Sequence, residues 1–322
     1  MKRREFLRHA GGIGAALLGA GGVAAESRFL ASLGMTNGGG STGREPRSAL
    51  GNASSAEARL AALPALPRRF AANETVTIGK TGIQTSLLAM GTGTVGSGHH
   101  SHQTALGVKG LSEMLLNGYE HGLRFFDAAD SYGNHPHVAK ALKHVPRDKV
   151  TVLTKTWARD AATARADIER FRSELGTDYI DICLMHCLTE GDWTERYRGV
   201  MDVMEEARQK GTIRAHGCSC HSIEALRTAT KSSWVQVHLV RINPVGSFMD
   251  SDPQTVVSVI REMKAAGKGI VGMKILGQGS MRDRQDEALK FALGLGLLDA
   301  FTIGAENRAE QEDSIRRIGV AA

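Results

Sequence analysis

From residue 73 onward the sequence alternates between short runs rich in Val, Ile, Leu and Phe and longer segments of helical length. This alternation predicts parallel strands that are each followed by a helix, because two parallel neighbours need a long crossover connection. Residues 163–175 and 197–211 are two clear helical segments. The predicted strand runs are residues 122–128, 149–155, 180–186, 213–219, 234–240, 269–276 and 299–305.

A hairpin is predicted ahead of these runs. Residues 74–94 contain two short alternating runs around the turn sequence GKTG, and the end of this region supplies an eighth strand. Eight strands in about 250 residues are the usual content of a (β/α)8 TIM barrel. A doubly wound sheet is the competing fold. We therefore predict an α/β chain with a (β/α)8 TIM barrel at residues 73–322.

The charge is distributed unevenly along the chain. Its formal net charge is +6, yet residues 1–72 contain ten Lys or Arg against four Asp or Glu, and residues 73–322 contain thirty of each sign. The predicted barrel is therefore neutral overall, without the basic stripe that binds a phosphate backbone. We expect no nucleic-acid partner.

The N-terminal segment explains the positive excess. Arg3 and Arg4 precede a Gly/Ala/Leu run with small residues up to Ala25, which is typical of a twin-arginine (Tat) signal peptide at residues 1–25. The alternative is a basic tail before a short buried helix. The run is too short and Gly-rich for a stable membrane anchor. We expect residues 26–72 to form a flexible linker and the Tat machinery to export the folded chain, to the periplasm or beyond.

Four chemically active side chains follow consecutive strands. Asp127, Lys155 and His186 each end a predicted strand, and Tyr132 comes five residues after the first of them. A strand-end lysine is usually solvated and a lone histidine is usually structural. In a barrel, however, the carboxyl ends of all strands meet at one rim, so the four side chains together predict an active site.

The residue types indicate carbonyl reduction. This reaction needs a hydride at carbon and a proton at oxygen, and a phenol with a pKa near ~10 is a poor proton donor at neutral pH. We expect Lys155 to lower the pKa of Tyr132, Asp127 to hold Lys155 charged, and His186 to orient the substrate oxygen. Since no side chain can supply a hydride, a nicotinamide cofactor is implied.

These residues resemble the aldo-keto reductase family. The segments FFDAADSYGN, TKTW, LMH and VQVHLVRINP, which start at residues 125, 154, 184 and 235, are similar to the family's active-site strands, and the hairpin resembles its barrel plug. The resemblance covers residues 74–318. It implies an NAD(P)-dependent oxidoreductase that interconverts a carbonyl (aldehyde, ketone or sugar) and an alcohol, with Tyr132 as the general acid and base of a catalytic tetrad.

The resemblance also implies binding residues. Ser219 and Gln236 would contact the nicotinamide carboxamide, with Cys220 where the family usually has Asn, while Trp157 and His186 would line the substrate pocket. The implied cofactor residues are Gly93, Thr94, Asp127, Ser219, Cys220, Gln236, Lys274, Leu276, Gly304, Asn307 and Arg308.

The chain departs from the family pattern at both ends of the implied cofactor site. Met273 and Lys274 stand where many relatives stack a tyrosine on the nicotinamide, so Lys274 would either reach the cofactor phosphates or lie in solvent. Glu310 stands where NADP-preferring relatives often carry a basic residue, which leaves Arg308 as the basic residue there. The resemblance slightly favours NADP over NAD.

Two further residue groups leave alternatives open. His99, His100 and His102 follow the first strand, and His135 and His137 follow the second. They could bind a metal or line a polar pocket, although no carboxylate or cysteine has obvious ligand spacing, and we predict no metal site. The alternative function is therefore a catalytically weak, exported barrel that binds a cofactor or a metal.

The four cysteines lie in or beside neighbouring predicted strands. They are Cys183, Cys187, Cys218 and Cys220. Cys218 and Cys220 have C-x-C spacing, which places two thiols on one face of a strand. Buried free thiols are the default interpretation, and a disulfide is the alternative in an oxidising compartment.

Overall fold

The structure is a computed structural model that describes residues 69–321. The predicted signal peptide and residues 26–68 of the predicted linker lie outside the described residues. Near the end of that linker, Ala72 is buried, and its carbonyl accepts a hydrogen bond from the Leu88 amide at 2.9 Å. The folded unit therefore includes residues slightly before position 73.

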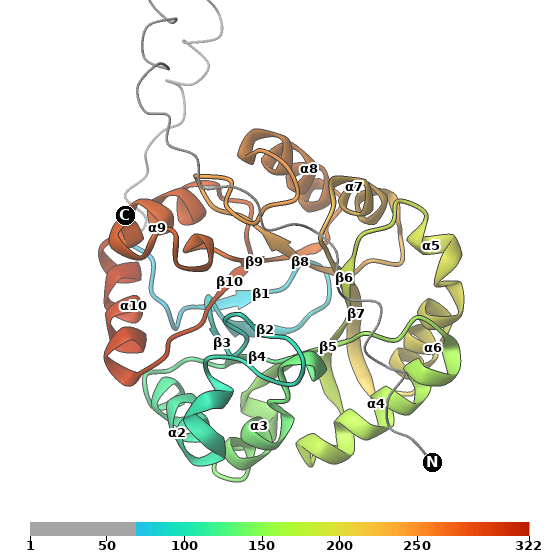
Figure 1. Cartoon of the computed structure of the whole chain (residues 1–322), viewed down its shortest axis with the longest axis horizontal. Helices are drawn as coiled ribbons and strands as arrows, with labels where there is room; N and C mark the ends of the chain where they lie inside the picture. The colour runs from blue at the N-terminus through green and yellow to red at the C-terminus, as the bar shows by residue number, and fades with distance from the viewer. Residues whose placement is uncertain (1–68, 322) are drawn as a thin grey trace, which may run out of the picture. The chain divides into compact units, whose positions relative to one another are not determined.

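Eight parallel strands pair side by side into a closed barrel, with helices around it (Figure 1). Each predicted strand run overlaps one of these strands, so the predicted fold class is confirmed. In order of pairing, the strands are β10 (Ala300–Ile303), β3 (Leu88–Gly91), β4 (Phe125–Asp127), β5 (Thr151–Thr156), β6 (Ile180–Leu188), β7 (Ile213–Cys220), β8 (Val237–Arg241) and β9 (Gly269–Met273).

The helices fall between successive strands, as the alternating pattern predicts. Asp160 accepts a hydrogen bond from the Thr163 amide and so caps the first turn of α4. The α-helices are α2 (Gly107–Glu120), α3 (His135–Leu142), α4 (Ala161–Leu175), α5 (Trp193–Arg196), α6 (Arg198–Gln209), α7 (Ile223–Lys231), α8 (Pro253–Ala265), α9 (Gln285–Gly294) and α10 (Arg308–Val320). Short 3-10 turns are η1 (Thr104–Leu106), η2 (Asp130–Tyr132), η3 (Arg147–Lys149), η4 (Gly277–Gly279) and η5 (Arg282–Arg284).

Buried apolar side chains form two layers. Strand residues such as Phe125, Leu153 and Leu239 fill the inside of the barrel. Residues that alternate with them, such as Phe126 and Val240, join a larger layer between the strands and the helices. Each fully buried side chain of this size contributes about 1.5–3 kcal/mol to stability. Two neighbouring strand residues therefore serve different layers.

The predicted hairpin is present at the start of the fold. β1 (Thr75–Thr77) pairs antiparallel with β2 (Gln84–Ser86), and Ile78 and Ile83 of its turn join the inner layer. The backbone of Gly79 approaches Gly269 so closely that a Cβ at residue 79 would lie 2.3 Å from the Gly269 nitrogen. The turn thus contacts the amino-terminal end of β9, and its role as a plug stays a prediction.

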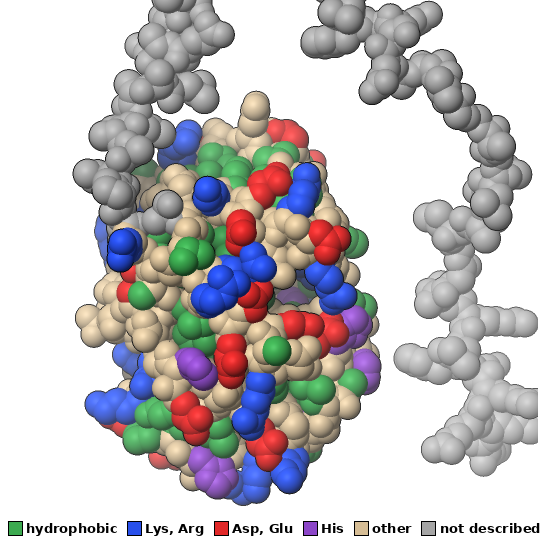
Figure 2. Space-filling view, turned by 90° about the vertical axis from the view of Figure 1, so that its left-hand side faces the viewer, with side chains coloured by type: hydrophobic (Ala, Val, Ile, Leu, Met, Phe, Trp, Pro, Cys, Tyr) green, Lys and Arg blue, Asp and Glu red, His purple; other side chains and the backbone are tan. Residues whose placement is uncertain are grey.

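Lys and Arg side chains are interspersed with Asp and Glu on the face shown in Figure 2, which is the left-hand side of the molecule in Figure 1, where α9 and α10 lie. Within residues 69–321, none of the helices combines the length and apolar character needed to cross a membrane.

Candidate active site

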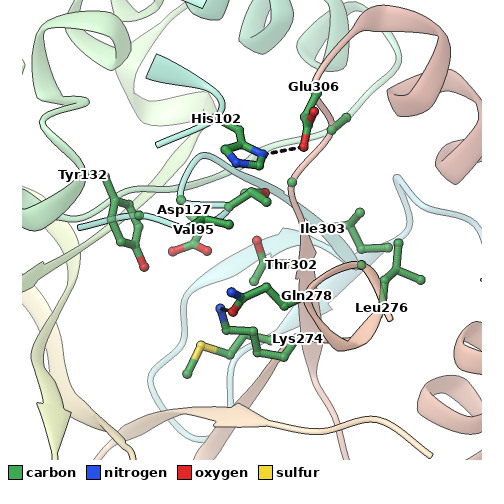
Figure 3. A pocket seen from close by; sticks show the side chains of 18 of the residues that line it. Val95, His102, Asp127, Tyr132, Lys274, Leu276, Gln278, Thr302, Ile303 and Glu306 are labelled. Atoms are coloured by element: carbon green, nitrogen blue, oxygen red, sulfur yellow. Dashed lines mark hydrogen bonds and ion pairs between the residues drawn. The ribbon is translucent and has the colours of Figure 1, made fainter. Parts of the chain in front are cut away.

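A pocket of about 960 Å³ lies at the carboxyl ends of the barrel strands (Figure 3). The loops after β3, β4, β9 and β10 contribute most of its wall. Of the residues expected to be catalytic or to bind cofactor or substrate, those that line it are Gly93, Thr94, Asp127, Tyr132, Trp157, His186, Lys274, Leu276 and Gly304.

A buried ion pair lies where β4 and β5 end side by side. The Lys155 ammonium donates to Asp127 Oδ1 at 2.6 Å and to the Ala128 carbonyl at 2.7 Å, and the Lys155 side chain is 1 % exposed. Burial alone would lower the pKa of Lys155, but the Asp127 carboxylate more than offsets this effect, and the pKa is raised. Lys155 is therefore charged.

Tyr132 is held in place by two glycines. It ends the turn η2, which Gly133 terminates in the left-handed conformation at φ +65°. A Cβ on Gly93 would lie 2.1 Å from the Tyr132 ring, and a Cβ on Gly96 would lie 2.3 Å from it. Lys155 Nζ lies 5.0 Å from the ring centroid. The two glycines therefore allow the β3 loop to pack closely against the ring. Gly96 was not singled out from the sequence as a site residue.

The pKa of Tyr132 differs from the sequence-based expectation. Burial raises it above 10, while the Lys155 ammonium lowers it and the Asp127 carboxylate raises it. The lowering by Lys155 is therefore present as expected, but desolvation of the phenolate outweighs it. The desolvation that reverses the net direction of the pKa shift could not be read from the sequence. Tyr132 is a protonated phenol at neutral pH.

His186 is a neutral imidazole beside Tyr132. The two ring centroids lie 5.7 Å apart at 83°. Nδ1 of His186 lies 3.4 Å from the Ser131 hydroxyl, and the Trp157 ring is 5.3 Å away. Burial, and then the nearby Lys155 ammonium, lower the pKa of His186 well below 6.5. The imidazole can donate or accept a hydrogen bond without adding charge.

Cys187 and His221 form a second polar pair that lines the pocket, and neither was singled out from the sequence as a site residue. Cys187 Sγ lies 3.3 Å from both ring nitrogens of His221. Burial raises the pKa of Cys187 to about 11 and lowers that of His221 to about 4. The pair is thus an uncharged thiol and an uncharged imidazole.

The structure does not bring the expected carboxamide contacts into the pocket. Ser219 is buried and accepts a hydrogen bond from the Cys187 amide at 3.1 Å. Cys220 lies on the opposite side of the wall, in the layer under the helices. Gln236 precedes β8, at its amino-terminal end, and accepts from the His216 amide at 3.2 Å. β8 runs five residues beyond Gln236, so its carboxyl end carries Arg241 instead.

The end of β9 supplies a methionine and a lysine to the pocket wall. Met273 and Lys274 both line the pocket. Lys274 has a positive φ of 59° and donates to Gln278 Oε1 at 2.6 Å. Burial, and then the charge of Arg241, lower its pKa. In Figure 3, Tyr132 lies at the left of the pocket and Lys274 below its middle.

The far end of the pocket, at the start of α10, has three carboxylates, those of Glu306, Glu310 and Asp313, and, among the described residues, one cation, Arg282, which lies 4.0 Å from Glu306. Glu306 and Glu310 line it, whereas Asn307 and Arg308 are outside the lining formed by the described residues. Asn307 Oδ1 accepts from the Glu310 amide at 3.0 Å, and a Glu310 oxygen accepts from the Glu306 amide at 2.9 Å. The Asn307 side chain thus occupies the amide of Glu310, the third residue of α10.

The loop histidines do not converge on one point. His102 Nδ1 lies 2.7 Å from Glu306 and links the β3 loop to the β10 loop, as Figure 3 shows. His135 is buried and contacts Glu174 at 2.7 Å, and His137 is buried nearby in α3. Within the described part of the chain, His99, His100, His102, His135 and His137 do not form a shared metal-ligand group.

Comparison with known proteins establishes the family. The aldo/keto reductase family model matches residues 87–292, and the chain belongs to this family. An aldo-keto reductase of Mycolicibacterium paratuberculosis is 32% identical over 139 residues, which are 40% of this chain and 47% of that protein. An uncharacterized oxidoreductase of Bacillus subtilis is 27% identical over 172 residues, which are 51% and 58% of the two chains. These matches span about half the length of the curated relatives.

Solved structures share the fold. A putative aldo-keto reductase from Pseudomonas aeruginosa superposes with a TM-score of 0.66 at 21% identity and covers 79% of this chain and 98% of its own. The holo form of an aldo-keto reductase from Bacillus halodurans gives a TM-score of 0.63 at 17% identity, covering 76% and 90%.

Proposed function

We propose that this protein is an NAD(P)-dependent oxidoreductase that interconverts a small carbonyl compound and its alcohol. The observation that carries the proposal is the grouping of Asp127, Tyr132, Lys155 and His186 around the inner end of one pocket. Membership of the aldo/keto reductase family supports the same reaction class.

In the proposed mechanism, Tyr132 donates its proton to the carbonyl oxygen during reduction and accepts it back during alcohol oxidation. Lys155 places a positive charge beside the phenol ring, which stabilises the phenolate that proton transfer leaves. Asp127 holds that ammonium in place. His186, being neutral, orients the substrate oxygen through a hydrogen bond, and Trp157 forms the adjoining wall.

The pocket fits a dinucleotide in its size and extent. Its lining extends from Tyr132 to Glu310, and its volume lies at the upper end of the usual range for small-molecule sites. Gly93, Thr94, Leu276 and Gly304 would hold the cofactor by backbone and apolar contacts. When bound, the nicotinamide supplies or accepts the hydride.

Binding and turnover together test this proposal. The purified chain is titrated with NADH and NADPH by protein fluorescence and then assayed with a panel of aldehydes, ketones and aldoses. Binding with turnover of at least one carbonyl is expected. Binding without turnover would favour the catalytically weak alternative, and failure to bind either dinucleotide would contradict both interpretations.

We propose further that NAD(H) binds more tightly than NADP(H), although the family resemblance slightly favours NADP. A 2′-phosphate at the start of α10 would face Glu306 and Glu310, and the Glu310 amide there is already capped by Asn307. Two like charges about 6 Å apart near a protein surface repel by about 2–3 kcal/mol before salt screening. We expect replacement of Glu310 by Lys to improve NADPH affinity about tenfold, or about 1.4 kcal/mol.

Fluorescence titration with both dinucleotides measures this change. The matched control is Glu312→Gln, because Glu312 is exposed on the same helix and lies outside the pocket lining formed by the described residues. Tighter binding of NADPH than of NADH by the unaltered chain would contradict the proposal.

The rate of carbonyl reduction should change little between about pH 7 and about pH 9. Reduction requires protonated Tyr132, whose pKa is raised above 10, and neutral His186, whose pKa is well below 6.5. The rate should therefore fall only as pH approaches the pKa of Tyr132, while alcohol oxidation, which needs the phenolate, should rise over the same range. The measurement is kcat/KM against pH in both directions at constant ionic strength. If the rate of reduction instead decreases around pH 7–8, the Lys155 ammonium lowers the pKa of Tyr132 by more than burial raises it.

We also propose that residues 1–25 direct export through the Tat machinery, and that the chain works outside the cytoplasm. The support is the sequence pattern around Arg3 and Arg4. Replacing both arginines with lysine should retain the protein in the cytoplasm, as measured by fractionation and immunoblotting. Unchanged export of this double variant would contradict the proposal.

A further inference from the structure

Three metal-ligand side chains lie together on the outer face of the barrel wall, behind the pocket. Cys218 of β7 is directly opposite His238 of β8 in the strand register, and Cys220 is two residues further along β7. The Sγ and ring nitrogen atoms of this cluster all lie within 4.8 Å of one another. All three side chains are fully buried. We call this group the Cys218–Cys220–His238 cluster.

The alternation of the strands sets the position of this cluster. In β8, Val237 and Leu239 fill the inside of the barrel, so His238 between them points outward. Cys218 and Cys220 likewise belong to the layer between the strands and the helices. The cluster is thus separated from the Asp127–Lys155 pair by the barrel wall and takes no part in the proposed reduction.

His238 is the anomaly that points to a ligand. Its side chain is 0% exposed, and among the described residues neither Nδ1 nor Nε2 has a hydrogen-bond partner. Leaving one buried polar atom unsatisfied costs about 1–3 kcal/mol, and the great majority of buried polar side-chain atoms are paired. One imidazole with a free lone pair and two thiols together form a donor set that suits a thiophilic metal ion.

The separation of the sulfurs favours a metal over a disulfide. Cys218 Sγ and Cys220 Sγ lie 4.0 Å apart. Two thiolates bound at 2.3 Å to one tetrahedral zinc ion are about 3.8 Å apart, so little movement is needed. In an extended strand, residues two apart have Cα atoms about 6.6 Å from each other. That spacing is near the upper limit for a disulfide, so closing one would distort β7.

We propose that Cys218, Cys220 and His238 bind a Zn²⁺ ion between the barrel wall and the surrounding helices. Two thiolates and one Zn²⁺ form an assembly of zero net charge, which suits a buried position. Asp250 offers a further oxygen nearby. Its Oδ1 accepts a hydrogen bond from Arg241 Nε at 3.1 Å, while its Oδ2 is buried without a partner in the described residues. Its carboxylate interacts electrostatically with Cys220 and His238.

The proposed site links β7 to β8 on the outer face of the barrel wall. Because the cluster is fully buried, the ion has to enter while the chain folds, and its binding energy adds to the stability of the folded state. The strand residue between the two thiols is Ser219, which supports the pocket residue Cys187 through a hydrogen bond. The metal is thus a structural ion that steadies this part of the pocket wall.

Metal analysis of the full-length protein tests the proposal. Purified protein is dialysed against EDTA without denaturant, and its metal content is measured by inductively coupled plasma mass spectrometry. About one zinc per chain is expected, and less than about 0.1 in Cys218→Ser. The matched control is Cys183→Ser, since Cys183 is also a fully buried thiol of the same layer but lies in β6, outside the cluster. This control should keep the metal.

Cobalt substitution guards against a variant that fails to fold. The unaltered chain is refolded with Co²⁺ and should show thiolate charge-transfer absorption together with the visible bands of a tetrahedral ion, as should Cys183→Ser. His238→Gln should lose both. The proposal is overturned if the unaltered chain neither holds zinc nor changes its spectrum with Co²⁺, or if alkylation under denaturing conditions reveals a Cys218–Cys220 disulfide in the native protein.

Discussion

Replacing Tyr132 with Phe should lower the rate of carbonyl reduction about 10³-fold, while NADH and NADPH affinities change little. A positioned general acid contributes roughly 10²–10⁴-fold, and this substitution removes the proton donor alone. The ring stays in place because Gly93 and Gly96 enclose its body. Steady-state kcat and dinucleotide titration measure the two effects separately.

The matched control for this substitution is Tyr179→Phe. Tyr179 stacks under Arg147 and lies outside the pocket lining of the described residues, so the control should retain full activity and affinity. If Tyr132→Phe keeps more than about a tenth of the original rate, Tyr132 is not the acid.

Replacing Lys155 with Met should lower the free energy of unfolding by about 3–5 kcal/mol, besides abolishing turnover. The substitution leaves the Asp127 carboxylate, whose side chain is 9% exposed, without its cationic partner. Removing one member of a buried ion pair carries a cost of this size, because the other charge stays desolvated. Urea unfolding followed by circular dichroism measures the loss.

The double variant Asp127→Asn with Lys155→Met separates stability from chemistry. It should recover most of the lost stability, since no buried charge is left unpaired, yet it should remain inactive because Tyr132 has lost its cationic neighbour. Lys210→Met is the surface control: Lys210 pairs with Glu206 in solvent, and its loss should leave stability nearly unchanged. Equal stability of the single and double variants would contradict the assignment of the loss to the buried carboxylate.

The positions of Asp127, Lys155 and His186 could be predicted because each follows a recognisable strand. Tyr132 followed from the same reasoning, since it lies a short turn beyond Asp127. Sequence spacing could not reveal Gly96, because its contact with the Tyr132 ring joins loops after different strands. Gly96 has no functional side chain, so its role depends on the contact with the Tyr132 ring that the fold creates.

The expected contacts of Cys220 and Gln236 depended on where strands begin and which way they face. A shift of one residue along a strand moves a side chain from the pocket to the outer layer. Cys220 points outward, and Gln236 stands at the beginning of β8 instead of its end. The resemblance placed Cys220 and Gln236 in or beside the strands where the structure has them. It could not predict the position of each residue along its strand or the direction of its side chain.

The barrel, its strand order and the rim that carries the reactive side chains follow from local pattern, because apolar periodicity and strand ends are properties of short segments. Three properties depend on the folded structure: the raised pKa of Tyr132, the acidic end of the pocket, and the His238 ring, which has no hydrogen-bond partner among residues 69–321. Desolvation, hydrogen-bond partners and the distance between charges arise from residues far apart in sequence. Packing therefore sets these three properties of the chain.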